Sequence, residues 1–130
     1  MTMAPFAESV PQRRSSLVFA HRGDHTVAPE NTLPAFEAAI RAGADGIELD
    51  VQLTADGTLV VYHDVSLRRL TGDDSKVSAH SLSELRTIRI RSVSSPAVQA
   101  PIPTLDEVLG LVSERLLVNL ELKNAVDPLC

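Results

Sequence analysis

The stretch that decides the fold is GIELDVQLTADGTLVVYHD, residues 46–64. Apolar residues occupy every second position over 47–53, and the residues between them are polar, which is typical of a strand with one buried face. Residues 55–57, Ala-Asp-Gly, are a turn signal, and a second apolar run over 59–62 ends at His63. These features predict two strands that, taken alone, fit a β-hairpin, because no crossover helix fits in so short a connection.

A helix is predicted just before this stretch. Apolar residues between Leu33 and Ile40 recur at the spacing of one helix face. Asn31 or Thr32 can cap the beginning of this helix, and Gly43 can end it.

Two further strands are predicted from short apolar patterns. Residues 17–20 form an apolar run that ends at His21, which indicates a buried strand. Residues 116–123 alternate again, which predicts another strand. The expected apolar face of that strand consists of Leu116, Val118, Leu120 and Leu122.

Two capping boxes predict two more helices. The S/T-x-x-E pattern occurs at residues 81–84 and again at 104–107, which indicates helices near 82–88 and 105–114. Residues 91–103 between them are rich in Ser and Pro and predict a loop. Strand and helix patterns alternate over most of the chain, so the expected fold class is α/β with a largely parallel sheet.

The composition limits the classes of partner. The net charge of −5 argues against a nucleic-acid partner and against an anionic membrane surface. Residues 1–16 are expected to form a flexible leader, since they lack the apolar stretch of a signal peptide. No segment is apolar enough to span a membrane, and a cytoplasmic location is expected. A single cysteine, Cys130, excludes an internal disulfide framework.

Carboxylates recur at a spacing of two along the predicted strands. Glu48 and Asp50 share one strand face, and so do Glu121 and Lys123. On an ordinary amphipathic strand such residues simply face solvent. Together, however, three carboxylates can hold a hard divalent cation such as Mg²⁺ or Ca²⁺.

Histidines and cations accompany these carboxylates. His21 and His63 each follow an apolar strand, and two histidines can exchange protons with a substrate. Arg22 and Lys123 can hold a phosphate group. The combination suits metal-assisted cleavage of a phosphodiester.

The order of these motifs resembles that of the glycerophosphodiester phosphodiesterase family. The resemblance runs from about Leu17 to Lys123. It rests on His-Arg-Gly at 21–23, Ala-Pro-Glu-Asn-Thr at 28–32, Gly-Ile-Glu-Leu-Asp-Val at 46–51, Asp-Gly at 56–57, His-Asp at 63–64, Ile-Pro-Thr-Leu-Asp-Glu-Val-Leu at 102–109 and Glu-Leu-Lys at 121–123. It implies a TIM-barrel fold of the phospholipase-C-like phosphodiesterase type. Since 130 residues are few for a barrel of typically ~250, residues 17–130 are expected to be a partial barrel domain, truncated to about the first half.

The resemblance also implies roles for the candidate residues. The metal ligands would be Glu48, Asp50 and Glu121. The general acid and general base would be His21 and His63, with neither role assigned to a particular histidine. The phosphoryl oxygens would be held by Arg22 and Lys123, and supporting positions would be taken by Glu30 and Asp64.

The implied reaction is hydrolysis of a small-molecule glycerophosphodiester to sn-glycerol 3-phosphate and an alcohol, with Mg²⁺ or Ca²⁺. Either water or the C2 hydroxyl of the substrate can be the attacking group. One alternative is a related phosphodiesterase that acts on lysophospholipid or sphingolipid headgroups. Another is a non-catalytic fragment, since about four strand segments are present against the eight of a barrel. Such a half-barrel would self-associate through its open sheet edges.

Overall fold

The computed structural model describes residues 16–93 and 97–123. Apart from Ser16, the expected leader lies outside the described residues, as do residues 124–130 with Cys130. Within the described ranges, no helix combines the length and the apolar character that crossing a membrane requires.

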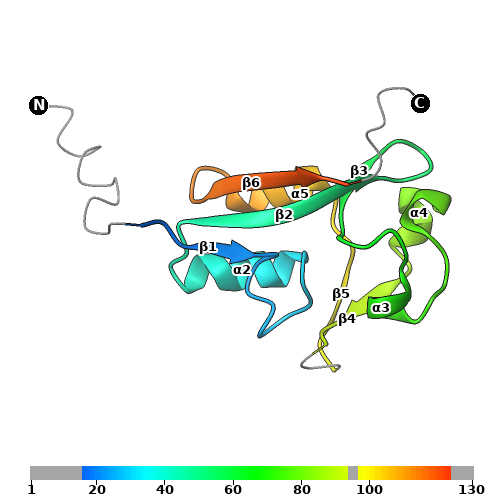
Figure 1. Cartoon of the computed structure of the whole chain (residues 1–130), viewed down its shortest axis with the longest axis horizontal. Helices are drawn as coiled ribbons and strands as arrows, with labels where there is room; N and C mark the ends of the chain where they lie inside the picture. Colours follow the sequence, from blue (N-terminus) through cyan, green and yellow to red (C-terminus); the bar gives the residue numbers. More distant parts are fainter. Residues whose placement is uncertain (1–15, 94–96, 124–130) are drawn as a thin grey trace, which may run out of the picture.

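The sheet is built around β2 (Gly46–Leu53), the strand predicted from the alternating stretch. β1 (Phe19–His21) and β6 (Leu117–Leu122) run parallel to β2, and β3 (Leu59–Val61) runs antiparallel to it (Figure 1). The predicted largely parallel sheet is therefore confirmed, and so is the hairpin between β2 and β3.

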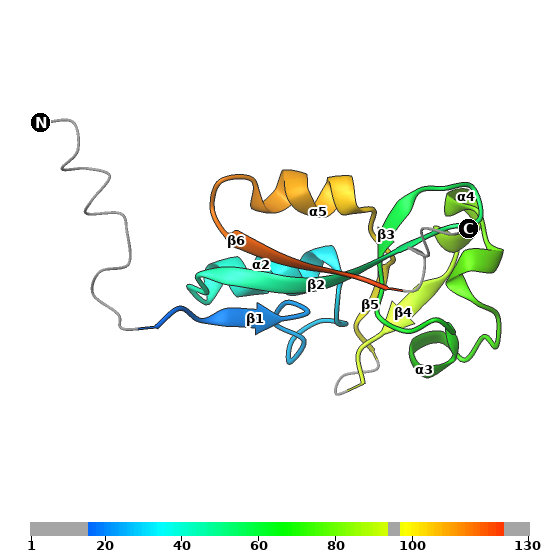
Figure 2. The same cartoon turned by 45° about the horizontal axis from the view of Figure 1, so that its top comes forward.

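Two helices cover one face of this sheet. α2 (Leu33–Arg41) and α5 (Leu105–Val112) lie side by side on that face, as Figures 1 and 2 show. Thr32 caps α2, and Thr104 opens α5 with the predicted capping box. The core beneath them consists of Phe36, Ala39, Ile47, Leu49, Val51, Val61, Val108 and Val112.

A second unit packs beside β3. It contains α3 (Arg68–Thr71), the 3-10 helix η1 (Val77–Ala79), α4 (Leu82–Leu85), β4 (Arg89–Arg91) and β5 (Gln99–Pro101). A second core lies between this unit and β3, and it consists of Val60, Tyr62, Leu67, Leu70, Val77, Leu85, Ile90 and Ile102.

Three boundaries in the second half of the chain differ from the prediction. The loop expected over 91–103 is wrong in part, because β4 and β5 pair as an antiparallel hairpin that buries Ile90 and Ala100. The helix expected near 82–88 ends at Leu85. The helix expected over 105–114 ends at Val112, because the backbone of Ser113 takes a φ of 45°.

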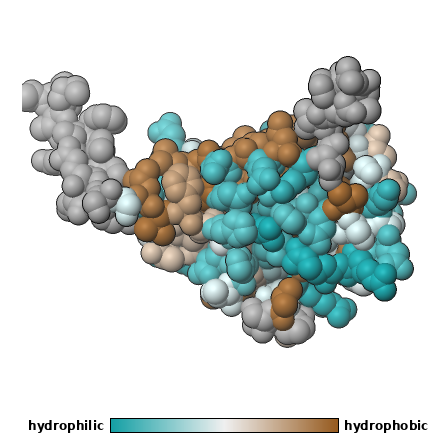
Figure 3. Space-filling view, in the orientation of Figure 1, coloured by the Kyte–Doolittle hydropathy of each residue, from teal (hydrophilic) through white to brown (hydrophobic). Residues whose placement is uncertain are grey.

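Two strands are less buried than predicted, because both lie at edges of the sheet. The strand expected to end at His21 is confirmed as β1, but its expected burial is wrong, since Val18 and Phe19 are 53% and 39% exposed. On β6, Val118 packs on the helical core, but Leu120 and Leu122 are 37% and 53% exposed. Figure 3 shows hydrophobic surface where β6 and the beginning of β1 lie, beside a broad hydrophilic region.

Candidate active site

Three carboxylates meet on the sheet face opposite the helices. Ile47, Leu49 and Val51 face the core, so the alternation of β2 turns Glu48 and Asp50 to the other side. Asp50 is directly paired with Glu121 across β2 and β6. One oxygen from each of these three carboxylates lies within 4.8 Å of the others, which is the grouping that the sequence predicted.

The charge balance and donor set of this cluster fit a hard divalent cation. Burial raises the pKa of Glu48, and the negative charges of Asp50 and Glu121 raise it further. Glu48 Oε1 is buried and has no hydrogen-bond partner among the described residues. The nearest histidine nitrogen, His21 Nε2, is 3.6 Å away, which is too long for a hydrogen bond. A cation with oxygen ligands would satisfy this oxygen and relieve the repulsion.

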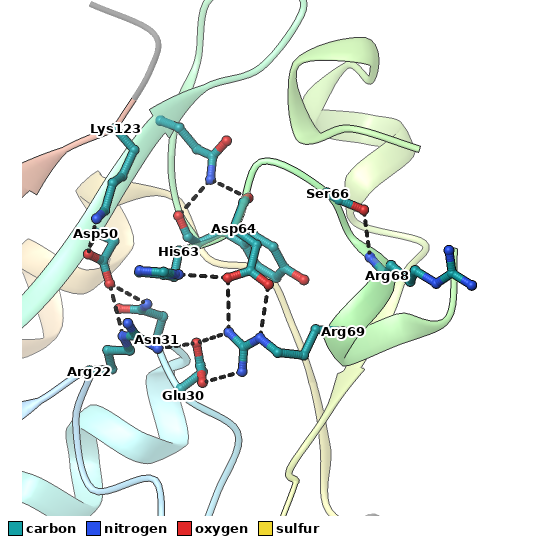
Figure 4. Close-up of polar contacts among 12 residues, drawn as sticks. Arg22, Glu30, Asn31, Asp50, His63, Asp64, Ser66, Arg68, Arg69 and Lys123 are labelled. Carbon is teal, nitrogen blue, oxygen red and sulfur yellow. Dashed lines mark hydrogen bonds and ion pairs between the residues drawn. The ribbon is translucent and has the colours of Figure 1, made fainter. Parts of the chain in front are cut away.

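Two cationic side chains flank Asp50, as Figure 4 shows. Arg22 Nε lies 3.4 Å from Asp50 Oδ2, an ion pair without hydrogen-bond alignment. Lys123 Nζ lies 3.8 Å from Asp50 Oδ1, and it also lies 2.8 Å from Glu121 Oε1. Both predicted phosphate-binding residues are thus at the cluster, where they are held by its negative charge.

The loop after β1 is held in an unusual backbone conformation. Arg22 and Asn31 both have a φ of 58°, a region that non-glycine residues rarely adopt. Arg22 N donates to Glu48 O at 2.8 Å, and Asn31 N donates to Arg22 O at 2.9 Å. These hydrogen bonds attach the loop to β2, and strain of this kind is typical of functional sites.

Asn31 contacts the carboxylate cluster, although it was predicted only as a possible helix cap. Its side-chain Nδ2 donates to Asp50 Oδ2 at 3.0 Å, and the cap is Thr32 instead. The signal was available, because Asn31 stands inside the Ala-Pro-Glu-Asn-Thr motif at 28–32.

His63 reaches the cluster because β3 runs back along β2. Val61 is paired with Val51, and Tyr62 N donates to Asp50 O at 2.9 Å. Gln52 Nε2 then donates to the carbonyls of Tyr62 at 2.7 Å and of Asp64 at 2.8 Å. The backbone that carries His63 is therefore fixed by the strand that carries two of the carboxylates.

A network of arginine and carboxylate side chains surrounds His63. His63 Nδ1 lies 2.6 Å from Asp64 Oδ1, so Asp64, for which a supporting position was predicted, contacts this histidine directly. Arg69 contacts both Asp64 and Glu30, and Glu30 also accepts from Arg22 Nη1 at 3.1 Å (Figure 4). Arg69 was missed, because no sequence pattern marks a side chain that acts across a long separation.

The remaining histidines differ in their relation to the site. His21 ends β1 and lies beside Glu48, with its side chain 62% exposed. His25 lies beside His21 with the rings edge to face and their centroids 6.3 Å apart. His80 bonds to Ser75 Oγ through Nε2 at 2.7 Å, within the second unit.

Parallel strands covered by helices on one face carry a group of carboxylate, histidine and cationic side chains on the opposite face, in an α/β framework. Residues 21–128 match the model of the glycerophosphoryl diester phosphodiesterase family. The chain belongs to this family.

Curated relatives cover most of the chain but are longer. A glycerophosphodiester phosphodiesterase from Bacillus altitudinis is 47% identical over 112 residues, which are 84% of this chain and 46% of the relative. One from Caldanaerobacter subterraneus is 44% identical over 113 residues, 85% of this chain and 46% of the relative. The chain spans about half the length of these relatives.

Solved structures of phosphodiesterases superpose on most of this chain. A glycerophosphodiester phosphodiesterase from Agrobacterium tumefaciens superposes with a TM-score of 0.78 at 38% identity, covering 85% of this chain and 48% of that one. A phosphodiesterase from Oleispira antarctica, solved with the product sn-glycerol-3-phosphate, gives 0.76 at 38% identity, covering 83% and 44%. These neighbours are TIM-barrel enzymes, and the present fold corresponds to about half of that barrel.

Proposed function

We propose that this chain carries the catalytic residues of a glycerophosphodiester phosphodiesterase, which hydrolyses a glycerophosphodiester to sn-glycerol 3-phosphate and an alcohol. The observation that carries the proposal is the meeting of Glu48, Asp50 and Glu121 within 4.8 Å. His21, His63 and the cationic side chains of Arg22 and Lys123 lie on the same side of the sheet. Family membership supports the reaction class.

In this proposal Glu48, Asp50 and Glu121 bind Mg²⁺ or Ca²⁺, both of which prefer oxygen ligands. When bound, the cation polarises a phosphoryl oxygen and stabilises the charge that develops there. Arg22 and Lys123 orient the phosphate and offset its negative charge. Both already lie at Asp50, so no large movement is needed to bring them to a phosphate beside the carboxylates.

The two histidines move the protons. One of His21 and His63 takes a proton from the attacking water or substrate hydroxyl, and the other protonates the leaving alkoxide. His63 has its Nδ1 held by Asp64, so its Nε2 is the atom available to the substrate. The exposed side chain of His21 lies near Glu48, on the β1 side of the carboxylates.

The test is an assay of sn-glycerol 3-phosphate release from glycerophosphocholine, with Mg²⁺, with Ca²⁺ and with a chelator. His21→Gln and His63→Gln should each lower turnover by about a hundredfold or more, the usual contribution of a general acid or base. His80→Gln is the matched control, because His80 lies outside the site. Near-normal turnover in either site variant would remove that histidine from the proton-transfer pair.

Exposed apolar side chains at the edge of the sheet favour a second candidate, a cation-binding chain without turnover. Leu120 and Leu122 of β6 are exposed beside the carboxylate cluster. The same assay separates the two: cation binding without product release would support the second candidate. Release from a lysophospholipid but not from glycerophosphocholine would support a related lipid phosphodiesterase instead.

A cytoplasmic location stays a prediction.

A further inference from the structure

Arg69 was not among the predicted functional residues, yet it hydrogen-bonds to two carboxylates of the site, Asp64 and Glu30. Its Nε and Nη2 donate to Asp64 Oδ2 and Oδ1 at 2.9 and 3.1 Å. Its Nη1 and Nη2 donate to Glu30 Oε1 and Oε2 at 3.0 and 2.8 Å. Both carboxylates are therefore held in the paired fork geometry that a guanidinium provides and an ammonium does not.

On one side, the network reaches His63. The hydrogen bonds from Arg69, and the bond and charge of His63, lower the pKa of Asp64 to about 2. Asp64 is therefore an ionised carboxylate near neutral pH and can only accept hydrogen bonds. The proton between Asp64 Oδ1 and His63 Nδ1, which are 2.6 Å apart, must then belong to the imidazole. When the ring is neutral, Nδ1 carries its proton and Nε2 keeps a free lone pair.

On the other side, the network reaches Arg22. Burial raises the pKa of Glu30, but the hydrogen bonds and charge of Arg69 and the charge of Arg22 outweigh burial, so the pKa is lowered overall. Glu30 is 10% exposed and accepts from both arginines through the same oxygen, at 2.8 and 3.1 Å. The orientation of Arg22 therefore depends on a carboxylate that Arg69 holds in place.

We propose that Arg69 is a positioning residue of the active site, which sets the tautomer and orientation of His63 through Asp64 and the orientation of Arg22 through Glu30. The effect of Arg69 on catalysis rests on the proposed function. Its effect on the tautomer of His63 can be measured without any turnover. Arg69 itself touches neither the carboxylate cluster nor His63 in the contacts of the described residues, so its action is indirect.

The chain provides a matched control in the neighbouring arginine. Arg68 Nη1 pairs with Asp74 Oδ1 at 3.1 Å, and both side chains are 75% exposed. Figure 4 shows Arg68 pointing away from this network, while Arg69 points toward Glu30 and Asp64. Arg68→Gln removes the same charge from the same helix without touching the network.

The experiment reads the His63 tautomer from the ¹⁵N shifts and proton couplings of its imidazole, at about pH 9, where an ordinary histidine is neutral. Wild type and Arg68→Gln should show mainly the Nδ1–H form. Arg69→Gln should shift His63 toward the Nε2–H form that free histidine favours in water. Arg69→Lys keeps the charge but loses the paired guanidinium geometry, so its tautomer populations should be intermediate. It replaces Arg69→Gln as the test variant if Arg69→Gln does not fold.

The same variants are then assayed for hydrolysis. Arg69→Gln should lower turnover by about 10- to 100-fold, the usual effect of losing a residue that orients an active-site ligand, with Arg69→Lys intermediate and Arg68→Gln unchanged. A wild type that lacks turnover while the tautomer still shifts would reject the proposed function and keep Arg69 as a positioning residue. A His63 tautomer that is the same in wild type and in the folded Arg69 variants would overturn this inference, whatever the turnover.

Discussion

Asp50 on β2 and Glu121 on β6 occupy directly paired positions on neighbouring parallel strands. This single pairing brings together two motifs that stand far apart in the sequence. Arg22, Asn31 and Lys123 then converge on Asp50, which is only 1% exposed. Asp50 is therefore the residue of the cluster that contacts the largest part of its surroundings.

Cation binding should depend on the carboxylates of the cluster. Asp50→Asn and Glu121→Gln should each lower the affinity for Mg²⁺ or Ca²⁺ by about tenfold or more, because affinity for hard cations falls as ligand charge is lost. Isothermal calorimetry measures this. Asp106→Asn, an exposed residue of α5, is the control. Equal affinity in wild type and both site variants would reject the assignment of these ligands.

Arg22→Lys should lower turnover by about tenfold or more while leaving the melting temperature nearly unchanged. Lysine keeps the positive charge but cannot contact Glu30 and Asp50 with separate nitrogens of one planar group, as Arg22 does at 3.1 and 3.4 Å. Steady-state kinetics measure the effect. Arg41→Lys, an exposed arginine in the last turn of α2, should be silent, and unchanged kinetics in Arg22→Lys would exclude a specific phosphate contact.

Acid should destabilise the fold partly through Asp64. Its pKa is about 2 in the folded protein, below the ordinary value of 3.8. A lowered folded pKa contributes stability that is fully present above the ordinary pKa and is lost as the pH falls through the folded one. The stability advantage of wild type over Asp64→Asn should therefore shrink between about pH 4 and pH 2. Thermal unfolding across that range measures it, and a constant difference would contradict the pKa shift.

Gly23→Ala should destabilise the protein by more than about 1 kcal/mol, because the new side chain meets both backbone strain and a steric clash. Gly23 has a φ of +78°, and a Cβ there would lie 2.8 Å from the carbonyl carbon of Ala35. Gly57→Ala is a matched control with a φ of +81° and nothing within 4 Å. Chemical denaturation should give a smaller loss for Gly57→Ala, and equal losses would show that strain alone decides.

The edge strand β6 should promote self-association. Among the described strands it pairs only with β2, and its residues Leu120 and Leu122 are 37% and 53% exposed. Open edges with apolar side chains pair readily with other chains. Size exclusion with light scattering should show oligomers that Leu122→Lys reduces and that Val27→Lys, at an exposed loop residue, leaves unchanged. A strictly monomeric wild type would contradict this expectation.

Local chemistry explains which elements could be predicted from the sequence. α2 begins after a side-chain cap at Thr32, and α5 begins with a capping box at Thr104, as expected. The alternation over 46–53 correctly placed Glu48 and Asp50 on one face. In each case the determining contacts lie within a few residues, so the pattern is visible without the fold.

Long-range packing explains what was missed. The β4–β5 hairpin lies where Ser and Pro suggest a loop, and it is held by burial of Ile90 and Ala100. Arg69 meets Glu30 only after α3 packs beside the loop that follows β1. The exposure of Leu122 follows from the edge position of β6, which alternation alone does not reveal.

β3 runs antiparallel to β2, and from this arrangement we expect an order in which the parts of the site form during folding. A hairpin closes a short loop, so it forms early and at low entropic cost, within about 1–10 μs in isolated cases. It already carries Glu48, Asp50 and His63. β6 comes from the far end of the described chain, so its pairing with β2 closes a much longer loop, and we expect it to form later. Glu121, the third carboxylate, would then join last, and we expect full cation affinity to appear only with that step, which stopped-flow refolding with and without the cation measures.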